Sequence, residues 1–360
     1  MPFEASLGRD DYLAPEVFER ERQVVFHRGW YLAMRADALE PGGRTVVDVV
    51  GESVLVTRSL DGELHAFANT CRHRGARLCD EGSRSGQGSI MCPYHAWTYA
   101  LDGRLISTPH LDTTDDERAE LGLWRVSVAE WHGFVFVSIA TEPPPFDAWL
   151  AANAPELVAL ERFDFGGLVT GARTVSTVQA NWKVLVENYL ECLHCTRVHP
   201  ELVDLVPTYR SGWNYDPSRA DGGVQIGGDS FSHSGRSGLP LLPGVDGVDI
   251  DSYFGGTIFP NGFIDVTGTS AIVSFLHPRT PDRTDVVTEY LFAPATVADE
   301  RFDPSPIVEF SELVARQDYG VCERVQLGVA SSCFTQGVLS TKDDLVIDWD
   351  RRYQQIMTTG

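Results

Sequence analysis

Residues 71–99 read CRHRGARLCDEGSRSGQGSIMCPYHAWTY, and this stretch holds two short motifs. Cys71 and His73 form Cys-x-His, Cys92 and His95 form Cys-x-x-His, and 18 residues separate His73 from Cys92. Two loops would each supply one thiolate and one imidazole. A [2Fe–2S] cluster can be held in this way, with two thiolates on one iron and two imidazoles on the other. The spacing therefore favours an iron–sulfur site.

The same four side chains could hold zinc instead. Zinc ribbons commonly use Cys-x-x-Cys pairs, and a Cys-x-His pair is unusual among them, so the spacing favours the cluster. Imidazoles in place of two thiolates lower the negative charge on the cluster and raise its potential, which suits the acceptance of electrons from a reductase. Cys79 lies outside the pattern and is expected to be a buried thiol.

The sequence around these motifs, from Arg44 to Ile139, consists of short alternating runs such as TVVDVVG and GFVFVSI between Gly and Asp turns. This pattern predicts a small antiparallel β-domain that carries both motifs on loops. The triple proline Pro143–Pro145 marks a boundary. We expect three segments, over residues 1–40, 41–142 and 146–360.

Helices and strands are both predicted in the rest of the chain. Periodicity predicts helices over residues 11–40, 146–162, 181–199 and 305–330. Strands are predicted over residues 167–178, 262–277 and 284–293, and a long Gly/Asp/Ser-rich loop over 211–252. The predicted fold class is α+β, with a small antiparallel β-domain inserted near the N-terminal end.

The residues that flank the two motifs, CxHRGxxL and CPYHxWxY, resemble the Rieske domain of the ring-hydroxylating oxygenase family. The resemblance implies that Cys71 and Cys92 bind one iron of the cluster, and that His73 and His95 bind the other. It implies a Rieske domain over residues 41–142. It further implies a helix-grip-like catalytic domain with a central antiparallel sheet, formed by residues 146–360 together with a helical part at residues 1–40.

A second group of candidate ligands lies in NWKVLVENYLECLHCTRVHPEL, residues 181–202. Two histidines and a carboxylate can bind one face of Fe(II) and leave the other face open to O2 and substrate. His194 and His199 are five residues apart, about 140° around an ideal helix, so a regular helix would not direct both at one metal. Because Pro200 disfavours the α conformation at His199, we expect the helix to end there and both imidazoles to reach one iron.

Histidine pairs at this spacing are common without a metal, and it is the first motif that favours their interpretation as ligands. The resembled family has a stretch similar to NWKxxxEN, then an acid and two histidines, at this place in the chain. The resemblance places the third ligand at Asp318, within QDYGVCERVQLG. Asp344 and Asp350 compete with it, but they lie in a polar, tail-like run and are expected to be solvated.

Two further residues take their roles from the resemblance. Glu191 stands where the family usually has an aspartate that joins a cluster histidine of one subunit to an iron-binding histidine of the next. A carboxylate bonded to both imidazoles would also fix their tautomers. The alternative is a surface glutamate at a helix end. Asn188, about one turn earlier, is expected to approach the iron.

ENYLECLHC and CPYHAWTYALDGRL look closest to the branch of the family that acts on betaine-like substrates such as glycine betaine, stachydrine or carnitine. The resemblance implies a monooxygenase that hydroxylates an N-methyl carbon, with N-demethylation as the outcome. A quaternary ammonium group binds aromatic faces, although core packing is the alternative for each aromatic residue. Candidates are Trp213, Tyr215, Phe231, Tyr253, Phe254, Phe259 and Phe263, with Arg210 for a substrate carboxylate.

Three other functions stay open at this point. An aromatic ring-hydroxylating mono- or dioxygenase would share every metal ligand. A non-catalytic Rieske electron carrier would need only the first motif, and the length of the chain beyond residue 145 speaks against it. A zinc-stabilised binding module would place zinc at the four residues of the first motif.

Charge and composition narrow the class of protein further. A net charge of −22 without a basic stripe argues against a nucleic-acid partner. No apolar run reaches the roughly 18–20 residues of a membrane span, and the charged N-terminus has no signal-like apolar region, so a cytoplasmic location is expected.

The number of cysteines and the lack of a dinucleotide-binding motif lead to expectations about disulfides and about the electron donor. Seven cysteines, an odd number, make a disulfide framework unexpected. No GxGxxG follows a predicted strand, so a separate flavin- or ferredoxin-type NAD(P)H reductase is expected to supply electrons. The family architecture implies a homotrimer.

Overall fold

The computed structural model describes residues 3–80, 88–109, 111–219 and 221–359. Contacts between residues divide the chain into two compact units. The smaller unit spans Phe26–Leu150, and the larger unit combines Met1–Val25 with Ala151–Gly360. The domain boundaries expected at residues 40, 142 and 146 stay predictions. The N-terminal residues of the larger unit thus precede the smaller unit in the sequence.

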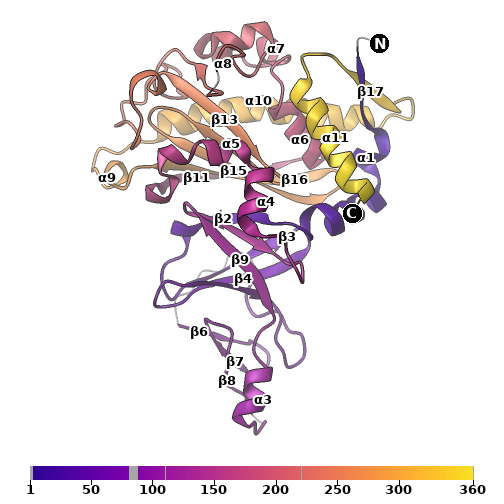
Figure 1. The fold of residues 1–360 in the computed structure, drawn as a ribbon, viewed down its shortest axis with the longest axis vertical. Coiled ribbons are helices and arrows are strands. Elements are labelled where there is room, and N and C mark those ends of the chain that lie inside the picture. The colour runs from indigo at the N-terminus through magenta and orange to yellow at the C-terminus, as the bar shows by residue number, and fades with distance from the viewer. Residues whose placement is uncertain (1–2, 81–87, 110, 220, 360) are drawn as a thin grey trace. The chain divides into compact units, whose positions relative to one another are not determined.

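The smaller unit contains two antiparallel sheets, which Figure 1 shows in indigo to magenta. The six-stranded sheet has the order β2-β10-β9-β5-β4-β3, and the three-stranded sheet has the order β6-β7-β8. Alternating Phe and Val form strand β10, which lies between β2 and β9 and is buried along its whole length. The bounds are β2 Tyr31–Arg35, β3 Arg44–Val49, β4 Glu52–Arg58, β5 Leu64–Ala68, β6 Ser89–Met91, β7 Thr98–Ala100, β8 Leu105–Ser107, α3 Asp115–Glu120, β9 Arg125–Trp131 and β10 Phe134–Ser138.

The helix predicted over residues 11–40 was wrong beyond Phe26. Helices α1 (Arg9–Leu13) and α2 (Pro15–Glu21) and a π-helical turn (Arg22–Phe26) are present, but Tyr31–Arg35 is strand β2. This strand pairs with β10 and buries Tyr31 and Leu32 completely. Residues 31–35 therefore form a strand because they pair with the hydrophobic strand β10, although their sequence has a helical periodicity.

The larger unit is built on a six-stranded antiparallel sheet of order β11-β16-β15-β14-β13-β12. Long hairpins join neighbouring strands, and α6 and α10 pack against β15 and β11. The α+β class with a central antiparallel sheet is confirmed. The bounds are β11 Val169–Val178, β12 Val224–Gln225, β13 Ser252–Ile258, β14 Gly262–Val266, β15 Ala271–Thr280, β16 Arg283–Phe292, α5 Pro155–Ala159, α6 Trp182–Tyr189, α7 Cys195–Val198, α8 Pro200–Leu205, α9 Pro294–Val297 and α10 Ser305–Val329. Helix α4 (Phe146–Asn153) includes the boundary between the two units, which follows Leu150.

The C-terminal residues form helix α11 (Asp344–Thr359), where a polar, solvated tail was expected. The helix buries Val346, Trp349, Asp350 and Tyr353, which lie three or four residues apart on one face. This narrow apolar stripe within a polar sequence explains why the helix was missed. The interpretation of Asp350 as solvated was therefore wrong, because its side chain is 5% exposed.

Helices α2, α6 and α11 meet at a buried ion pair in the larger unit. Glu21 and Lys183 are fully buried and paired with each other. Glu21 also accepts hydrogen bonds from Trp182 Nε1 at 2.9 Å and from the Tyr353 hydroxyl at 2.6 Å. A buried carboxylate that is both paired and hydrogen-bonded is tolerated in a core. The contact joins the two ends of the chain, as does the pairing of β1 (Glu4–Gly8) with β17 (Gln336–Leu339) in Figure 1.

We expect Asp350→Asn to stabilise the protein at alkaline pH. Burial raises the pKa of Asp350 to about 7, and the nearby Asp11 carboxylate adds to the effect. The folded chain therefore holds the proton more tightly than the unfolded chain, and stability falls as the pH rises from about 4 to 7. The variant should remove much of this loss and gain about 1–3 kcal/mol at pH 8, measured by denaturant unfolding across pH.

Asp348→Asn, on the same helix but 75% exposed, is the control and should change nothing. Equal stability of wild type and Asp350→Asn at both ends of the pH range would contradict the prediction.

Among the described residues, no helix has the length and apolar character that crossing a bilayer requires.

Candidate metal centres

The ligand candidates His194 and His199 lie on either side of a short helix. α6 ends at Tyr189, residues 190–193 are not helical, and α7 begins directly after His194. His199 has φ −124° and ψ 64°, outside the helical region, and Pro200 starts α8. The helix break expected at His199 is present, and it lets both imidazoles turn toward one point.

Asp318 on α10 meets both imidazoles at that point. Its Oδ1 lies 2.8 Å from Nε2 of His199 and 3.2 Å from Nε2 of His194. One donor atom from each of the three residues lies within 4.8 Å of the others. Two imidazole nitrogens and one carboxylate oxygen converging in this way fit a facial iron site. Of the rival acids, Asp344 accepts a hydrogen bond from Tyr215 instead, and Asp350 is buried on α11.

The far nitrogen of each imidazole has its own acceptor. Nδ1 of His194 lies 2.6 Å from Oε1 of Glu191, and Nδ1 of His199 lies 2.8 Å from Oε1 of Gln317. These bonds fix the tautomers that leave both Nε2 atoms free to bind a metal. Gln317 was missed by sequence reasoning. It directly precedes Asp318 on a helix, where neighbours point in different directions, so no spacing signal marked it.

The pKa values of His194 and Asp318 are shifted by their neighbours. Desolvation favours neutral His194, but hydrogen bonds to Asp318 and Glu191 outweigh it and raise the pKa of His194 to about 9. Desolvation opposes ionisation of Asp318 as well, yet the two histidines hold the pKa of Asp318 below its usual value. A metal ion bound here would replace the proton that this cluster shares.

Glu191 lies in the loop between α6 and α7 and holds it together. Its Oε2 accepts hydrogen bonds from the backbone N–H groups of Leu193 and His194, while Oε1 faces the His194 ring. Glu191 is thus not a free surface glutamate. Asn188, on the last turn of α6, lies in the wall of the adjoining cavity.

The same loop contains a disulfide, Cys192–Cys195, that the odd cysteine count did not predict. Two residues lie between the two cysteines in sequence, and their Cα atoms are 5.0 Å apart. The expectation of no disulfide framework was wrong for this pair. Among the described residues, the other five cysteines are free.

The first motif forms two loops of equivalent backbone geometry in the smaller unit. The carbonyl groups of Cys71 and Cys92 each accept a hydrogen bond from the residue four positions later, Gly75 and Ala96. Both of those residues have positive φ, +71° and +57°. Glycine adopts this conformation freely and alanine does not, so the second loop is held by its surroundings. Each loop presents one cysteine and one histidine.

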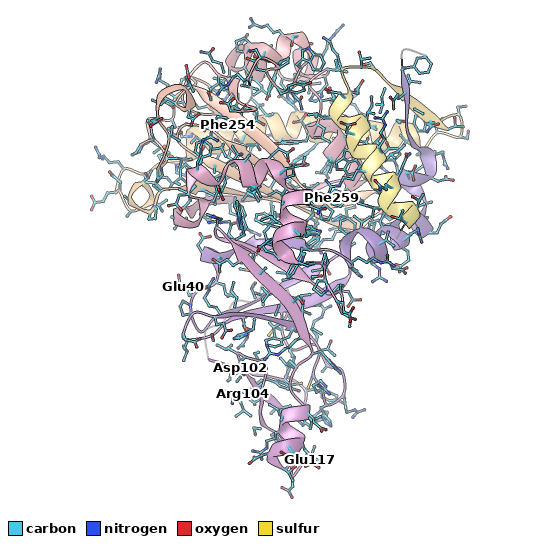
Figure 2. All side chains as sticks on the ribbon, in the orientation of Figure 1. Glu40, Asp102, Arg104, Glu117, Phe254 and Phe259 are labelled. Carbon is cyan, nitrogen blue, oxygen red and sulfur yellow. A yellow bond between two sulfur atoms is a disulfide. The ribbon has the colours of Figure 1, made fainter. Side chains whose placement is uncertain are left out.

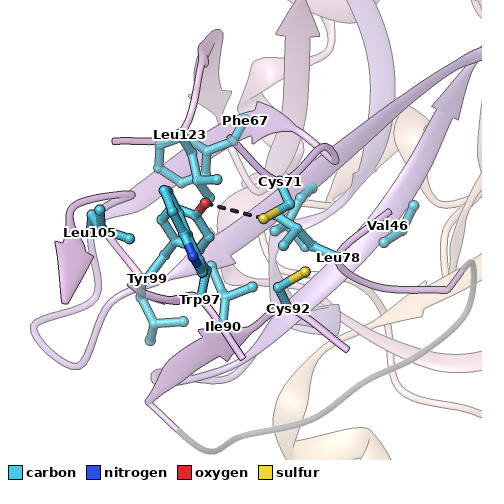
Figure 3. Close-up of a cluster of buried hydrophobic side chains, with 12 residues drawn as sticks. Val46, Phe67, Cys71, Leu78, Ile90, Cys92, Trp97, Tyr99, Leu105 and Leu123 are labelled. Atoms are coloured by element: carbon cyan, nitrogen blue, oxygen red, sulfur yellow. Dashed lines mark hydrogen bonds between the residues drawn. The ribbon is translucent and has the colours of Figure 1, made fainter. Parts of the chain in front are cut away.

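The thiols and imidazoles of these loops lie on opposite sides of the candidate site. Cys71 and Cys92 are buried in a core with Trp97 and Tyr99, and Figure 3 shows their sulfur atoms in this core. His73 and His95 are more exposed, and their ring centroids are 4.7 Å apart. A pair of buried thiolates and a pair of outward imidazoles fits a two-iron cluster with unlike ends. Cys79 is half-buried at the edge of this core.

Replacement of Tyr99 by phenylalanine should lower the reduction potential of a cluster held here. The Tyr99 hydroxyl lies 3.4 Å from Sγ of Cys71, and Figure 3 draws this contact as a dashed line. A donor to sulfur stabilises the reduced, more negative cluster. Loss of one such bond, about 0.5–1.5 kcal/mol, corresponds to roughly 20–65 mV for one electron. Redox titration of the visible spectrum measures the shift, and an unchanged potential would contradict it.

A cavity of about 520 Å³ in the larger unit adjoins His194, His199 and Asp318. Four of the seven aromatic candidates line it: Tyr215, Phe231, Tyr253 and Phe263. Trp213, Phe254 and Phe259 do not, and Figure 2 labels the last two. Six further aromatic residues of the lining were not expected: Tyr189, Tyr209, Tyr290, Phe310, Tyr319 and Trp349. Their places in α6, α10, α11, β16 and a 3-10 turn (Pro207–Ser211) are far apart in sequence.

Arg210 does not line the cavity, so its candidacy as a carboxylate ligand is not supported. It is 58% exposed and pairs with Asp204. Among the described residues of the lining, Arg352 on α11 is the one arginine, and no lysine is present. Arg352 lies over the ring of Phe259 at 4.5 Å.

Comparison with protein families finds two matches along the chain. The Rieske [2Fe-2S] domain family matches residues 29–128. The family described as ring hydroxylating alpha subunit (catalytic domain) matches residues 165–359. The first match contains both cysteine–histidine motifs, and the second contains His194, His199 and Asp318.

Curated relatives and solved structures are similar over most of the chain. The glycine betaine monooxygenase oxygenase subunit of Pseudomonas aeruginosa is 29% identical over 93% of this chain and 85% of that protein. The carnitine monooxygenase oxygenase subunit of Acinetobacter pittii is 29% identical, covering 89% and 84%. The quaternary ammonium Rieske monooxygenase CntA in complex with L-carnitine superposes with a TM-score of 0.75 at 22% identity, covering 99% and 96%. A naphthalene 1,2-dioxygenase with bound indole gives 0.69 at 21% identity, covering 93% and 83%.

Proposed function

The chain belongs to the family of ring-hydroxylating oxygenase alpha subunits, and on that premise we propose that it hydroxylates an N-methyl carbon of a small quaternary ammonium substrate. Family membership makes it an iron-dependent oxygenase with a Rieske [2Fe–2S] cluster, a mononuclear iron and O2 as co-substrate. The observation that carries the substrate proposal is the cavity beside His194, His199 and Asp318, with ten aromatic residues in its wall. Aromatic faces attract quaternary ammonium groups.

The residues of the chain divide between two metal sites. Cys71, Cys92, His73 and His95 are proposed to hold the cluster, and His194, His199 and Asp318 the mononuclear iron. When bound, the cluster supplies single electrons and the iron supplies O2 activation. The donor sets fit both groups, as their convergence and burial indicate.

The surrounding side chains position the iron ligands and the substrate. Glu191 and Gln317 accept from Nδ1 of the two histidines and so aim both Nε2 atoms at the metal. Asn188 faces the same cavity from α6. The aromatic and aliphatic side chains of the wall limit water near the reacting methyl group, and the polar groups of the lining orient the substrate.

The overall reaction consumes O2, two electrons and two protons, and yields a hydroxylated N-methyl group and water. The N–CH2–OH group then loses a proton from its hydroxyl, the C–N bond breaks toward nitrogen, and formaldehyde leaves a tertiary amine. The electrons come from a separate reductase, which we propose to be a flavin- or ferredoxin-type NAD(P)H protein. A homotrimer in the cytoplasm, in which Glu191 contacts a cluster histidine of the neighbouring subunit, is part of the proposal.

The test is a substrate panel with purified chain, a compatible reductase and NAD(P)H. Betaines, carnitine and choline are assayed for formaldehyde, and simple arenes for hydroxylated product. Formaldehyde in a one-to-one ratio with O2 consumed is the expected result. Hydroxylated arene without formaldehyde would replace the proposal with aromatic ring oxygenation, to which the fold is equally suited.

A further inference from the structure

Asp265 on β14 is a deep carboxylate in the wall of the cavity. Its Oδ1 accepts hydrogen bonds from the hydroxyl groups of Tyr253 at 2.7 Å and Tyr189 at 2.8 Å. Its Oδ2 accepts none from the described residues and is not among the fully buried atoms. Burial raises the pKa of Asp265 to about 6. The side chain nevertheless keeps some accessible surface, and that surface faces the cavity.

No cationic side chain compensates this carboxylate. The titratable groups that face it are the phenols of Tyr189, Tyr253, Tyr209 and Tyr290, from α6, β13, a 3-10 turn and β16. Burial raises the pKa of each phenol, so all four are neutral near pH 7. Within the part of the chain that the structure describes, no lysine, arginine or histidine pairs with Asp265.

An ionised carboxylate in such a place is costly unless a positive charge joins it. Arg352 is engaged elsewhere, because it donates to Asn153 and lies over the Phe259 ring. A positively charged ligand entering the cavity would supply the missing charge.

The surroundings of Asp265 are shaped for a compact, weakly hydrated cation. The Tyr189 ring stacks on the Phe263 ring, with centroids 4.2 Å apart and planes 5° apart. The two phenol hydroxyls approach the backbone so closely that a Cβ on Gly255 would lie 2.1 Å from the Tyr253 hydroxyl. Glycine at this position therefore permits both phenols to reach Asp265. Aromatic faces attract quaternary ammonium groups, and a carboxylate beside them adds the attraction of an opposite charge.

We propose that Asp265 supplies the counter-charge for the cationic nitrogen of the substrate and so makes the cavity select organic cations over neutral molecules of the same shape. The inference rests on the proposed function and deepens it by naming the residue that sets charge specificity. Tyr189 and Tyr253 are positioning residues that hold Oδ1 and leave Oδ2 to the ligand.

The experiment compares matched ligands by calorimetry on the full holoenzyme. Choline and glycine betaine are each paired with the tert-butyl analogue in which carbon replaces the charged nitrogen. Wild type should bind the cation of at least one pair more tightly by at least about 30-fold, the effect of one partnered buried charge. Asp265→Asn should reduce this ratio to about threefold or less. Asp204→Asn is the control and should retain the wild-type ratio, because this acid is 81% exposed and lies outside the cavity lining.

The pH dependence gives a second readout. A protonated Asp265 carries no charge, so cation affinity of wild type should weaken as the pH falls below about 6, while affinity for the tert-butyl analogue stays constant. Tyr253→Phe removes a donor that favours the ionised form and should move this midpoint to higher pH. This second variant keeps the carboxylate and serves if Asp265→Asn fails to fold.

The outcomes separate the two proposals. The role of Asp265 is overturned if Asp265→Asn keeps the wild-type ratio of cation to tert-butyl analogue affinity. It is also overturned if Tyr253→Phe leaves the pH midpoint of cation affinity unchanged. Both results would count even if the enzyme releases formaldehyde from a cation. Equal binding of cation and tert-butyl analogue by wild type overturns it as well. Formaldehyde from no cation, with oxygenation of an arene, overturns the proposed function.

Discussion

Replacing His199 with alanine should abolish formaldehyde release and leave the visible spectrum of the [2Fe–2S] cluster unchanged. His199 is 1% exposed, and its Nε2 lies 2.8 Å from Asp318 in the group of three converging donors. Without it, two ligands remain, too few to hold iron on one face of a facial site. Iron per chain should fall from about three to about two atoms, while the acid-labile sulfide and the rhombic signal of the reduced cluster persist.

Two further histidine variants test whether the loss of iron is specific to the ligand positions. His194→Ala, at the opposite side of Asp318, should give the same loss of one iron. His233→Ala, an exposed histidine of the larger unit that does not line the cavity, should keep both iron and turnover. Full turnover in His199→Ala or His194→Ala would refute the assignment of the mononuclear site.

Replacing Glu191 with alanine should reduce turnover by about 10–100-fold, the usual effect of losing a group that orients a metal ligand. The carboxylate bonds Nδ1 of His194 at 2.6 Å and accepts from two backbone N–H groups of the ligand loop. The alanine variant should therefore bind iron more weakly. It should also reoxidise the reduced cluster slowly when substrate and O2 are added in a single turnover.

Glu191→Gln separates orientation from electron transfer. The amide oxygen can still accept from His194, but the amide NH2 then faces the backbone N–H groups of Leu193 and His194, so iron content should recover only in part. A neutral amide cannot accept from two imidazoles as a carboxylate does, so cluster reoxidation should stay slow if Glu191 links two subunits. Wild-type reoxidation in Glu191→Gln would show that the residue only orients His194. Glu309→Gln, exposed on α10, is the matched control.

The metal-ligand candidates were predictable because their signals are local. Cysteines and histidines at fixed short spacings report a loop geometry, and the loops at Cys71 and Cys92 do share one hydrogen-bonding pattern. The break at His199 followed from the proline after it. Asp318 was identified from the family resemblance, because the 118 residues between His199 and Asp318 contain no spacing pattern that marks a ligand. The assignment of all these side chains as metal ligands stays a proposal.

The cavity wall could not be predicted, because it forms between segments far apart in sequence. Tyr189 and Asp265 are 76 residues apart and become neighbours only when α6 packs over the sheet. Gln317 and Asp265 are polar residues within amphipathic elements, where a sequence offers no reason to single them out. Helix α11 and strand β2 were misjudged for a related reason: packing partners, and not local periodicity, decide their structure.

The arrangement of β1 and α2 within the larger unit has a consequence for synthesis of the chain. Residues 4–21 leave the ribosome first, yet their partners β17, Lys183 and Tyr353 follow hundreds of residues later or near the end. The smaller unit, Phe26–Leu150, draws its contacts from one continuous stretch and can fold as soon as it emerges. We therefore expect nascent chains halted near residue 300 to carry a protease-resistant smaller unit and a cleavable segment at residues 4–21, which becomes protected only after β17 and α11 have emerged.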